Sequence, residues 1–288
     1  MKLINGKEIS NGLRLEIKDQ VKKIKQETGN LPGIATILVG KNPASQIYIK
    51  SKIKACQEVG IQSFHHNLGE NSSKENIISL INKLNKNSAV DGILLQLPLP
   101  NNKYTQDCIN AINPLKDIDG LHPLNAGLLN LSKNWDEIIK KNILVSCTPL
   151  GIIYLLHKSN ISIERKTAIV IGRSNLVGKP VSMLLLANNA TVIIAHSKTK
   201  NLKKICKNAD IVIAAIGNSK FLNKNFIKDG ATIIDVGINR TPDGLCGDVD
   251  FNSVKNMNVT ITPVPGGVGP MTITMLLENT LKAFKNRC

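Results

Sequence analysis

The chain has 288 residues, of which 42% are hydrophobic, 3% are aromatic and 20% are charged. This length and hydrophobic content are sufficient for two globular α/β domains. Lysine and arginine number 37 against 21 aspartates and glutamates, a formal net charge of +16. The basic residues are spread along the chain and no dense basic run alternates with aromatics. We therefore expect most of this charge on solvated faces, and the low aromatic content argues against a base-stacking nucleic-acid surface.

Cysteine usage and the N-terminus indicate the compartment. The six cysteines are scattered, with no Cys-x-x-Cys pair and no histidine at zinc-ligand spacing, so we expect neither a disulfide framework nor a metal site. Residues 1–8 lack the apolar segment of a signal peptide, and no apolar run is long enough to span a bilayer. We expect a cytoplasmic protein with reduced thiols and no membrane association.

The first predicted elements are a helix and a buried strand. Apolar residues recur at helical spacing from Ile9 to Ile24, and the helix is predicted to end near Gly29. Residues 34–40 then form an apolar run typical of a buried strand. Residues 41–45 are predicted to turn into a second helix.

This second helix carries a candidate acid/base pair. Ser45, Tyr48, Lys52 and Cys56 follow one another at steps of three and four, so they share one helix face. A phenol and an ammonium group at this spacing can reach one ligand atom. For Tyr48 and Lys52 alone, a solvated helix face is the simpler alternative.

A strand at 61–66, a helix at 74–87 and a strand at 90–95 are predicted next. The last strand continues into Gln96-Leu97-Pro98-Leu99-Pro100. Two prolines prevent further ladder pairing, so the sheet ends here and exposes Gln96 at a strand carboxyl end, where open α/β sheets bind ligands. The alternative is a turn that only terminates the strand.

A polar connection at 113–120 is suited to a domain boundary, and its two acids, Asp117 and Asp119, are expected to face a cleft. A helix is predicted from Cys147 to about Lys158.

The segment that follows has the pattern of a β–α–β unit. Residues 167–171 form an apolar strand, a glycine-bounded turn leads to Pro180 at the start of a helix, and residues 191–196 form a second strand. A helix N-terminus presents unpaired N–H groups, so the turn suits a dinucleotide pyrophosphate. Gly172 and Gly178 do not match the Gly-x-Gly-x-x-Gly spacing, which leaves a tight connection without ligand as an alternative.

The second strand of this unit indicates the cofactor. NAD-binding units place an acid about 20 residues beyond the glycine turn, whereas a 2′-phosphate needs donors there. Here the place holds His196-Ser197-Lys198-Thr199, with Arg173 in the preceding turn. Charge-assisted hydrogen bonds favour the phosphate, so we predict NADP rather than NAD.

Three more buried strands are predicted at 209–217, 231–237 and 258–262. A loop rich in proline and glycine at 262–270 allows the backbone to approach a flat ligand, and a terminal helix follows. The chain is therefore predicted to be an α/β protein of two domains, an N-terminal α/β domain and a Rossmann-like NADP-binding domain with a mostly parallel sheet.

Taken together, these motifs resemble those of the bifunctional methylenetetrahydrofolate dehydrogenase/methenyltetrahydrofolate cyclohydrolase family. The resemblance covers essentially the whole chain, and the segments occur in that family's order. They are residues 39–45, 48–52, 96–100, 117–120, 172–174, 177–180, 196–199 and 263–272.

The resemblance implies a domain organisation and site residues. Residues 1–120, joined by a C-terminal helix at 271–288, would form the folate-binding catalytic domain, and residues 121–270 the NADP-binding domain. Lys52 would be the principal catalytic residue, Tyr48 would pack by the folate, Gln96 would partner the lysine and Asp119 would hold the pterin ring. The binding residues implied are Ser45, Leu97, Pro265, Gly266, Gly267, Val268 and Gly269 for the folate, and Gly172, Arg173, Ser174, Ser197 and Ile238 for NADP.

The implied activity is NADP-dependent oxidation of 5,10-methylenetetrahydrofolate to the methenyl form, followed by hydrolysis to 10-formyltetrahydrofolate. Ring opening needs proton transfers, for which Lys52 must supply a neutral fraction near pH 7 although a free lysine has a pKa of about 10.4. A neutral amide at Gln96 suits that need better than a carboxylate. The family is commonly dimeric, so a homodimer is expected. Leu128 stands where many members carry arginine.

Two alternative functions make different predictions. A two-domain oxidoreductase resembling shikimate dehydrogenase would explain the β–α–β unit but not residues 96–100 or the loop at 265–270. A basic nucleic-acid-binding module would retain DNA or RNA with a steep salt dependence and show no turnover.

Overall fold

The structure is a computed structural model, and it describes residues 1–242 and 244–287. Within those residues the strands form a six-stranded sheet, a three-stranded sheet and a two-stranded hairpin. The chain divides into two compact units. The six-stranded unit comprises residues 1–11, 129–139 and 148–272, and the three-stranded unit comprises residues 12–128, 140–147 and those from 273 onward.

The three-stranded unit is built around β2 (Gly33–Val39), which lies between β3 (Gln62–Leu68) and β4 (Gly92–Leu95). Both pairings are parallel, with Ala35 opposite Phe64 on one side and Ile93 on the other. All seven residues of β2 are buried, as expected of a central strand covered on both faces. The three predicted strands are confirmed, and their carboxyl ends meet at one edge of the sheet.

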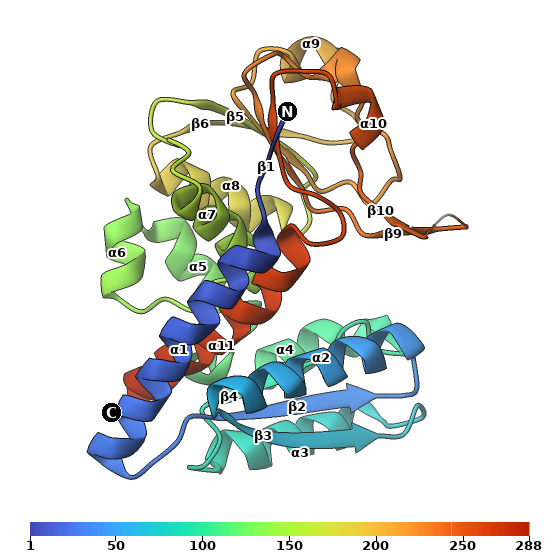
Figure 1. Cartoon of the computed structure of the whole chain (residues 1–288). Helices are drawn as coiled ribbons and strands as arrows, with labels where there is room; N and C mark the ends of the chain where they lie inside the picture. Colours follow the sequence, from blue (N-terminus) through green and yellow to red (C-terminus); the bar gives the residue numbers. More distant parts are fainter. Residues whose placement is uncertain (243, 288) are drawn as a thin grey trace. The chain divides into compact units, whose positions relative to one another are not determined.

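The helices of this unit lie on two faces of the sheet. α2 (Pro43–Val59) and α3 (Lys74–Lys86) cover opposite faces (Figure 1). The chain steps from β2 to β3 and then back past β2 to β4, so two right-handed crossovers place their helices on opposite sides. α4 (Thr105–Ala111) joins α3 in one apolar core through the buried Cys108. Two short 3₁₀ turns flank α4, at Asn102–Tyr104 and Pro114–Lys116.

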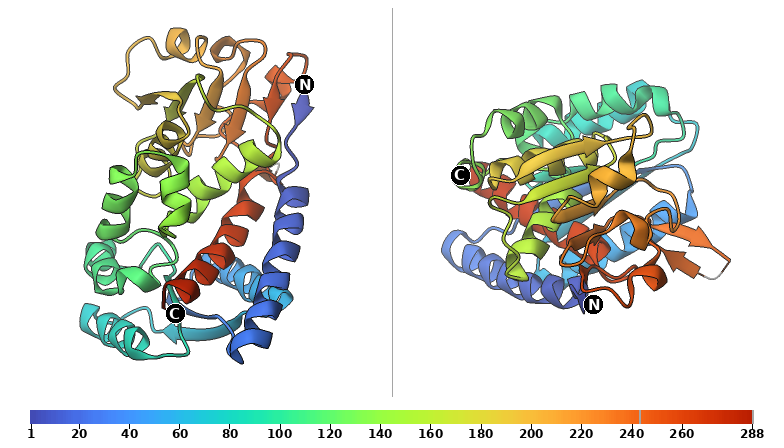
Figure 2. Two further views of the ribbon diagram at one scale, coloured as in Figure 1. Left: turned by 90° about the vertical axis from the view of Figure 1, so that its left-hand side faces the viewer. Right: turned by 90° about the horizontal axis from the view of Figure 1, so that it is seen from above.

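Two long helices, α1 (Gly6–Thr28) and α11 (Val268–Arg287), complete this unit. Their parts in the three-stranded unit run side by side in the same direction (Figure 2). Arg14 Nε donates to Thr274 Oγ1 at 3.1 Å, and Lys285 Nζ donates to Gln20 Oε1 at 3.0 Å. Both helices bury apolar residues at helical spacing. They are Leu13, Ile17 and Val21 on α1, as predicted, and Leu277, Leu281 and Phe284 on α11.

The six-stranded unit has a wholly parallel sheet in the order β1-β11-β8-β7-β5-β6. The strands are β1 (Lys2–Leu3), β5 (Thr167–Ile171), β6 (Thr191–Ala195), β7 (Ile211–Ala214), β8 (Thr232–Asp235) and β11 (Thr260–Ile261). The chain passes from β5 to β6 on one side and returns to β7 on the other. The carboxyl ends of β5 and β7 therefore flank a topological switch point, where such sheets bind ligands.

Helices and a hairpin connect these strands. Between β5 and β6 runs α8 (Gly178–Ala187), as predicted. The later connections contain α9 (Leu202–Cys206), a 3₁₀ turn at Lys224–Phe226, the hairpin of β9 (Asn239–Thr241) and β10 (Gly244–Cys246), and α10 (Phe251–Val254). The segment between β4 and β5 carries α5 (Pro123–Leu131), α6 (Trp135–Lys140) and α7 (Cys147–Lys158), and its residues are divided between the two units.

The fold class is confirmed, and the structure adds features that the sequence analysis lacked. β1 pairs with β11, so residues 1–11 belong to the six-stranded unit. The units also differ from the predicted domain boundaries at residues 121–128 and 140–147. Cys56, Cys108, Cys147, Cys206 and Cys246 are free thiols, and Cys288 lies outside the described residues. In the described part of the chain, no helix is both long and apolar enough to cross a membrane.

Candidate active site

α2 presents the predicted acid/base face of the three-stranded unit. The helix begins with Pro43 in its first turn, and the Asn42 side chain caps it by accepting from Ser45 N at 3.1 Å. Ser45 is buried, Tyr48 is 38% exposed and Lys52 is partly buried. One helix face therefore runs from a buried hydroxyl to a phenol and an ammonium group that reach solvent.

Lys52 and Gln96 are in direct contact. Lys52 Nζ donates to Gln96 Oε1 at 3.0 Å, while Gln96 Nε2 donates to Leu97 O at 2.7 Å. Gln96 follows β4, and its backbone N–H still donates to Ile37 O of β2 at 2.9 Å. The amide nitrogen is thus engaged by the backbone, which fixes the amide oxygen toward the lysine.

Asp119 lies near this pair. Burial raises the pKa of Asp119, and the positive charge of Lys52 and a hydrogen bond from Cys147 oppose that rise. The Asp119 carboxyl group is therefore close to both the Lys52 amine and the Cys147 thiol, and both lower its pKa.

Asp117, the other acid of this loop, has a structural role. It is 1% exposed and accepts from His122 N at 2.8 Å and from Asn125 Nδ2 at 2.9 Å. The expectation that Asp117 faces a cleft is wrong, because its buried carboxylate accepts from the loop that leads into α5 and from α5 itself. Burial raises the pKa of Asp117, and these hydrogen bonds oppose the rise.

Cys147 was not singled out as a site residue by the sequence analysis. The thiol is buried and donates to Ile118 O at 3.3 Å. Burial, reinforced by the charge of Asp119, raises the pKa of Cys147 well above its usual value. A buried thiol with this environment is an inert donor rather than a nucleophile.

In the six-stranded unit, the turn after β5 places the predicted cofactor residues. A Cβ on Gly172 would lie 2.2 Å from Ala215 O, so only glycine allows the ends of β5 and β7 to approach this closely. Ser174 Oγ accepts from Val177 N at 3.1 Å and from Gly178 N at 3.3 Å, which stabilises the entry to α8. Arg173 between them is exposed.

The remaining predicted cofactor residues follow β6 and β8. Ser197 is exposed after β6, in a turn closed by His196 N donating to Thr199 Oγ1 at 2.9 Å. Ile238 is 48% exposed after β8. Both lie at the same carboxyl edge as Gly172. The glycine turn, the helix N-terminus and the exposed donors fit a dinucleotide with a 2′-phosphate.

Two buried carboxylates lie beneath these loops. Asp248 accepts from Ile216 N at 2.6 Å, Gly217 N at 2.9 Å and Asn218 N at 3.0 Å, and so fixes the turn after β7. Asp235 accepts from the N–H groups of Gly237, Asp248 and Val249 at 2.9–3.0 Å. Burial raises the pKa of Asp235 to about 6, and the hydrogen bonds from these amides oppose the rise. No local sequence pattern marks either residue.

The predicted folate loop, residues 265–269, belongs to the six-stranded unit, and its last two residues are the first two of α11. Gly266 O accepts from Lys7 N at 2.9 Å, which ties the loop to the start of α1. Leu97 lies beside Gln96 in the three-stranded unit and is partly buried.

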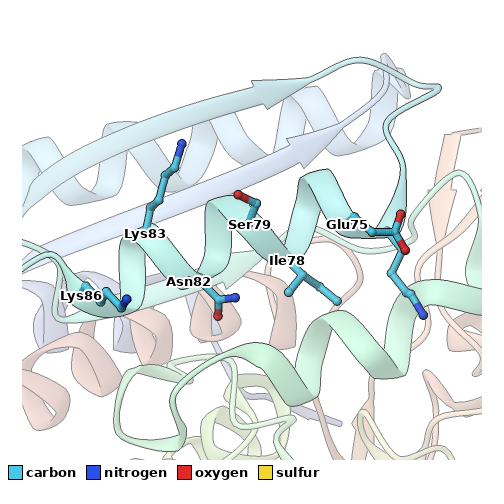
Figure 3. Close-up of a pocket in the computed structure, with 7 residues that line it drawn as sticks. Glu75, Ile78, Ser79, Asn82, Lys83 and Lys86 are labelled. Carbon is cyan, nitrogen blue, oxygen red and sulfur yellow. The ribbon is translucent and has the colours of Figure 1, made fainter.

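A surface groove on α3 contains none of the predicted site residues. It is lined by Lys74, Glu75, Ile78, Ser79, Asn82, Lys83 and Lys86, all from one helix (Figure 3). α3 covers the sheet face opposite α2, which carries Lys52. The groove is therefore not the active site. The described residues hold no cluster of three or more histidine, cysteine, aspartate or glutamate side chains that would ligate a metal ion.

The fold and these side chains define a class of protein: a two-domain oxidoreductase that uses a nicotinamide dinucleotide. The three-stranded unit carries the site formed by Lys52 and the amide of Gln96. The model of the tetrahydrofolate dehydrogenase/cyclohydrolase catalytic domain matches residues 4–119, and that of the NAD(P)-binding domain of the same proteins matches residues 146–288.

Relatives that match nearly the whole chain belong to the same family. The bifunctional protein FolD of Agathobacter rectalis is 50% identical over 284 residues, which cover 98% of this chain and 99% of the relative. The crystal structure of the FolD dehydrogenase/cyclohydrolase of Campylobacter jejuni has a TM-score of 0.94 at 45% identity, with 100% of both chains covered. The Trypanosoma brucei FolD structure, complexed with NADP cofactor and inhibitor, has a TM-score of 0.91 at 35% identity, covering 99% of this chain and 97% of that one.

The chain belongs to the tetrahydrofolate dehydrogenase/cyclohydrolase family. It is a bifunctional enzyme that oxidises methylenetetrahydrofolate with NADP and hydrolyses methenyltetrahydrofolate, as the sequence analysis predicted. The shikimate dehydrogenase of Aquifex aeolicus, at 12% identity and a TM-score of 0.50, shares only the fold.

Proposed function

We propose that both reactions take place at Lys52, with Gln96 as its partner, Asp119 holding the pterin ring and Tyr48 packing against the folate. The observation that carries this proposal is the 3.0 Å hydrogen bond from Lys52 Nζ to Gln96 Oε1, beside the carboxyl group of Asp119. These polar side chains come together in the three-stranded unit from α2, from the residue after β4 and from the loop after the 3₁₀ turn at Pro114–Lys116.

The oxidation step depends on orientation. A hydride leaves the methylene carbon between two folate nitrogens, whose lone pairs stabilise the resulting cation. NADP supplies the hydride acceptor when bound. No proton moves in this step, so the protein's contribution is to hold the folate in register, through Asp119, Tyr48 and the further contacts Ser45 and Leu97.

The hydrolysis step depends on proton transfer. Water adds to the amidinium carbon of the methenyl form, loses a proton, and the ring opens after one folate nitrogen gains a proton. Lys52 carries these protons. Gln96 holds the amine by a neutral acceptor, which leaves it free to exchange a proton, whereas a carboxylate in this position would keep it charged.

Other residues bind the ligands. The loop of Pro265, Gly266, Gly267, Val268 and Gly269 lines the folate pocket, and Gly172, Ser174 and Ile238 contact the dinucleotide. Arg173 and Ser197 select NADP over NAD by binding its 2′-phosphate. By function, residues 1–120 and 271–288 would form the folate domain and residues 121–270 the NADP domain, a division that differs from the two compact units at residues 1–11, 121–128, 140–147 and 271–272. The glycine turn and the exposed donors at the strand ends support the dinucleotide contacts.

Lys52→Met tests the role of the lysine, because methionine keeps the length of the side chain without a titratable group. We expect cyclohydrolase activity to fall at least about 100-fold, the usual contribution of general acid–base catalysis. Dehydrogenase activity is expected to survive in part. The two rates are measured separately, on methylenetetrahydrofolate with NADP and on supplied methenyltetrahydrofolate. Equal survival of both activities would remove Lys52 from the mechanism.

Gln96→Glu tests the requirement for a neutral partner. A carboxylate at this position would form an ion pair with Lys52 and hold it protonated, so we expect cyclohydrolase activity to fall about tenfold or more. The pH profile of the remaining activity is the second measurement, since it is expected to move to higher pH. Unimpaired cyclohydrolase activity at unchanged pH would argue against this role.

The protein is further proposed to be a cytoplasmic homodimer that binds tetrahydrofolate derivatives and neither nucleic acid nor membranes. The scattered free cysteines support the cytoplasmic location, and the absence of basic runs with interleaved aromatics argues against nucleic acid. The homodimer rests on the family resemblance. Sedimentation equilibrium gives the oligomeric state. Salt-dependent retention on DNA or RNA, or sedimentation with lipid vesicles, would contradict the choice of partners.

A further inference from the structure

Asn279 on α11 joins two distant segments of the three-stranded unit. Its side chain is fully buried, and its Nδ2 donates to Ile118 O and to Val145 O, each at 2.8 Å. Both neighbours are backbone carbonyls, which only accept, so the orientation of the amide is defined by its surroundings. A single side chain thus connects α11 to the loop between the 3₁₀ turn at Pro114–Lys116 and α5, and to the segment before α7.

The two segments that Asn279 joins carry groups of the active site. Ile118 precedes Asp119, and Val145 lies two residues before Cys147. Cys147 Sγ donates to Ile118 O at 3.3 Å and accepts from Asn279 Nδ2 at 3.7 Å, and the thiol lies close enough to the Asp119 carboxyl group to influence its pKa. Asn279 therefore reaches Asp119 in two ways. One is the hydrogen bond to Ile118 O, whose peptide unit leads directly to Asp119, and the other is the Cys147 thiol, which lies near both side chains.

The backbones of these segments are in close contact where Asn279 holds them. Gly120 has a φ of 66°, and a Cβ there would lie 2.3 Å from Ser146 N and from Val145 C. The peptide after Asp119 thus rests directly on the segment at 145–146. A change in their spacing would move the Asp119 carboxyl group, because no side chain lies between them to absorb the change.

We propose that Asn279 is a positioning residue for folate binding, which sets the place of Asp119 by holding residues 118–120 against residues 145–147. The inference rests on the proposed role of Asp119 at the pterin ring. Without the amide, Val145 O loses its Asn279 donor and Ile118 O keeps only the Cys147 thiol as a donor, so the loop shifts toward other partners. The folate then binds to a displaced carboxyl group while the dinucleotide contacts of the six-stranded unit stay intact.

Thr280, the next residue on α11, provides a matched control. It is also fully buried, but its hydroxyl donates to Leu276 O of its own helix at 2.8 Å. Thr280→Val removes a buried polar group from α11 and preserves the side chain's shape. Asn279→Leu does the same at the neighbouring position and in addition removes the link between the two segments.

The experiment measures KM for the folate substrate in both reactions, KM for NADP, kcat and the melting temperature. We expect Asn279→Leu to raise the folate KM about tenfold in both reactions, the effect of losing about one net hydrogen bond. KM for NADP stays unchanged. Asn279→Ser keeps one donor, so its folate KM is expected between those of the wild type and Asn279→Leu, and it carries the same test if the leucine variant does not fold. Thr280→Val leaves the folate KM unchanged.

A purely structural role would give a different pattern. If the folded Asn279 variants lower the melting temperature as Thr280→Val does and leave the folate KM unchanged, the inference is overturned. Asp119→Ala separates this outcome from failure of the proposed function. An unchanged folate KM in Asp119→Ala would remove Asp119 from the pterin site, whereas a raised KM in Asp119→Ala alone would contradict only the role of Asn279.

Discussion

The candidate sites of the two units differ in the groups that form them, which are mainly side chains in one unit and mainly backbone groups in the other. In the three-stranded unit, the candidate site consists of side chains. They are Lys52 and Gln96, which are joined by a hydrogen bond, the Asp119 carboxyl group and the nearby Cys147 thiol. In the six-stranded unit, it consists mainly of backbone: the turn at Gly172, the N-terminus of α8, and the turn at residues 216–218 fixed from below by Asp248.

This difference follows from where the chemistry resides. Folate ring opening requires protons that the protein must move, so the site needs titratable side chains held at defined distances. Hydride transfer uses the reactivity of the nicotinamide, so the protein supplies shape, N–H groups and orientation. Variants in the two units should accordingly separate the two activities.

Asp248→Asn should give the largest separation. Asparagine keeps the shape but turns an NH2 group toward the backbone N–H groups of residues 216–218, so donors face donors beneath the cofactor turn. We expect kcat/KM for NADP to fall about 1,000-fold, or ~4 kcal/mol, the cost of about two unmade hydrogen bonds to a buried charged group. Titration calorimetry should show the matching loss of NADP affinity.

The control is the cyclohydrolase activity of the same variant, measured on supplied methenyltetrahydrofolate, which we expect to be preserved. Asp250→Asn is a matched variant. It removes a neighbouring carboxylate that caps α10 by accepting from Ser253 N at 3.3 Å. Loss of both activities in Asp248→Asn, or an equal loss of NADP affinity in Asp250→Asn, would contradict a specific role under the cofactor turn.

Asp235 predicts a pH dependence of stability in the six-stranded unit. Burial raises its pKa from the ordinary 3.8 to about 6, so the folded chain binds this proton more tightly than the unfolded chain. The group therefore destabilises the fold above pH 6, and this cost is relieved as the pH falls from 6 to about 4. The difference corresponds to at most ~3 kcal/mol, since one pH unit is worth about 1.4 kcal/mol.

The measurement compares urea unfolding of the wild type and Asp235→Asn at several pH values. The asparagine does not titrate, so the unfolding free energy of the wild type relative to the variant should rise as the pH falls from 6 to 4 and stay level above pH 7. Parallel curves for the two proteins would show that Asp235 does not titrate in this range.

The sequence predicted those parts of the sites that depend on local spacing. Tyr48 and Lys52 share a face because residues four apart do so on any helix, and Gln96 was located by the prolines that end β4. Asp248 and Asn279 were not found, because each acts through a carbonyl or amide of a segment far away in the sequence. Such contacts produce no local sequence pattern, and the sequence alone does not distinguish a buried aspartate from an exposed one.

The separation of roles should extend to the choice of cofactor, with a smaller effect. Arg173→Ala removes an exposed guanidinium at the end of β5, and we expect kcat/KM for NADP to fall about tenfold, or ~1.4 kcal/mol, which is modest because the group is solvated. The value for NAD should be unchanged, since NAD has no 2′-phosphate. Lys179→Ala is the matched control, because this exposed lysine donates to Asn175 Oδ1 at 2.8 Å on the same turn. Equal losses with NADP and NAD would show that Arg173 supports the turn itself and that specificity for the 2′-phosphate depends on Ser197 and its neighbours after β6.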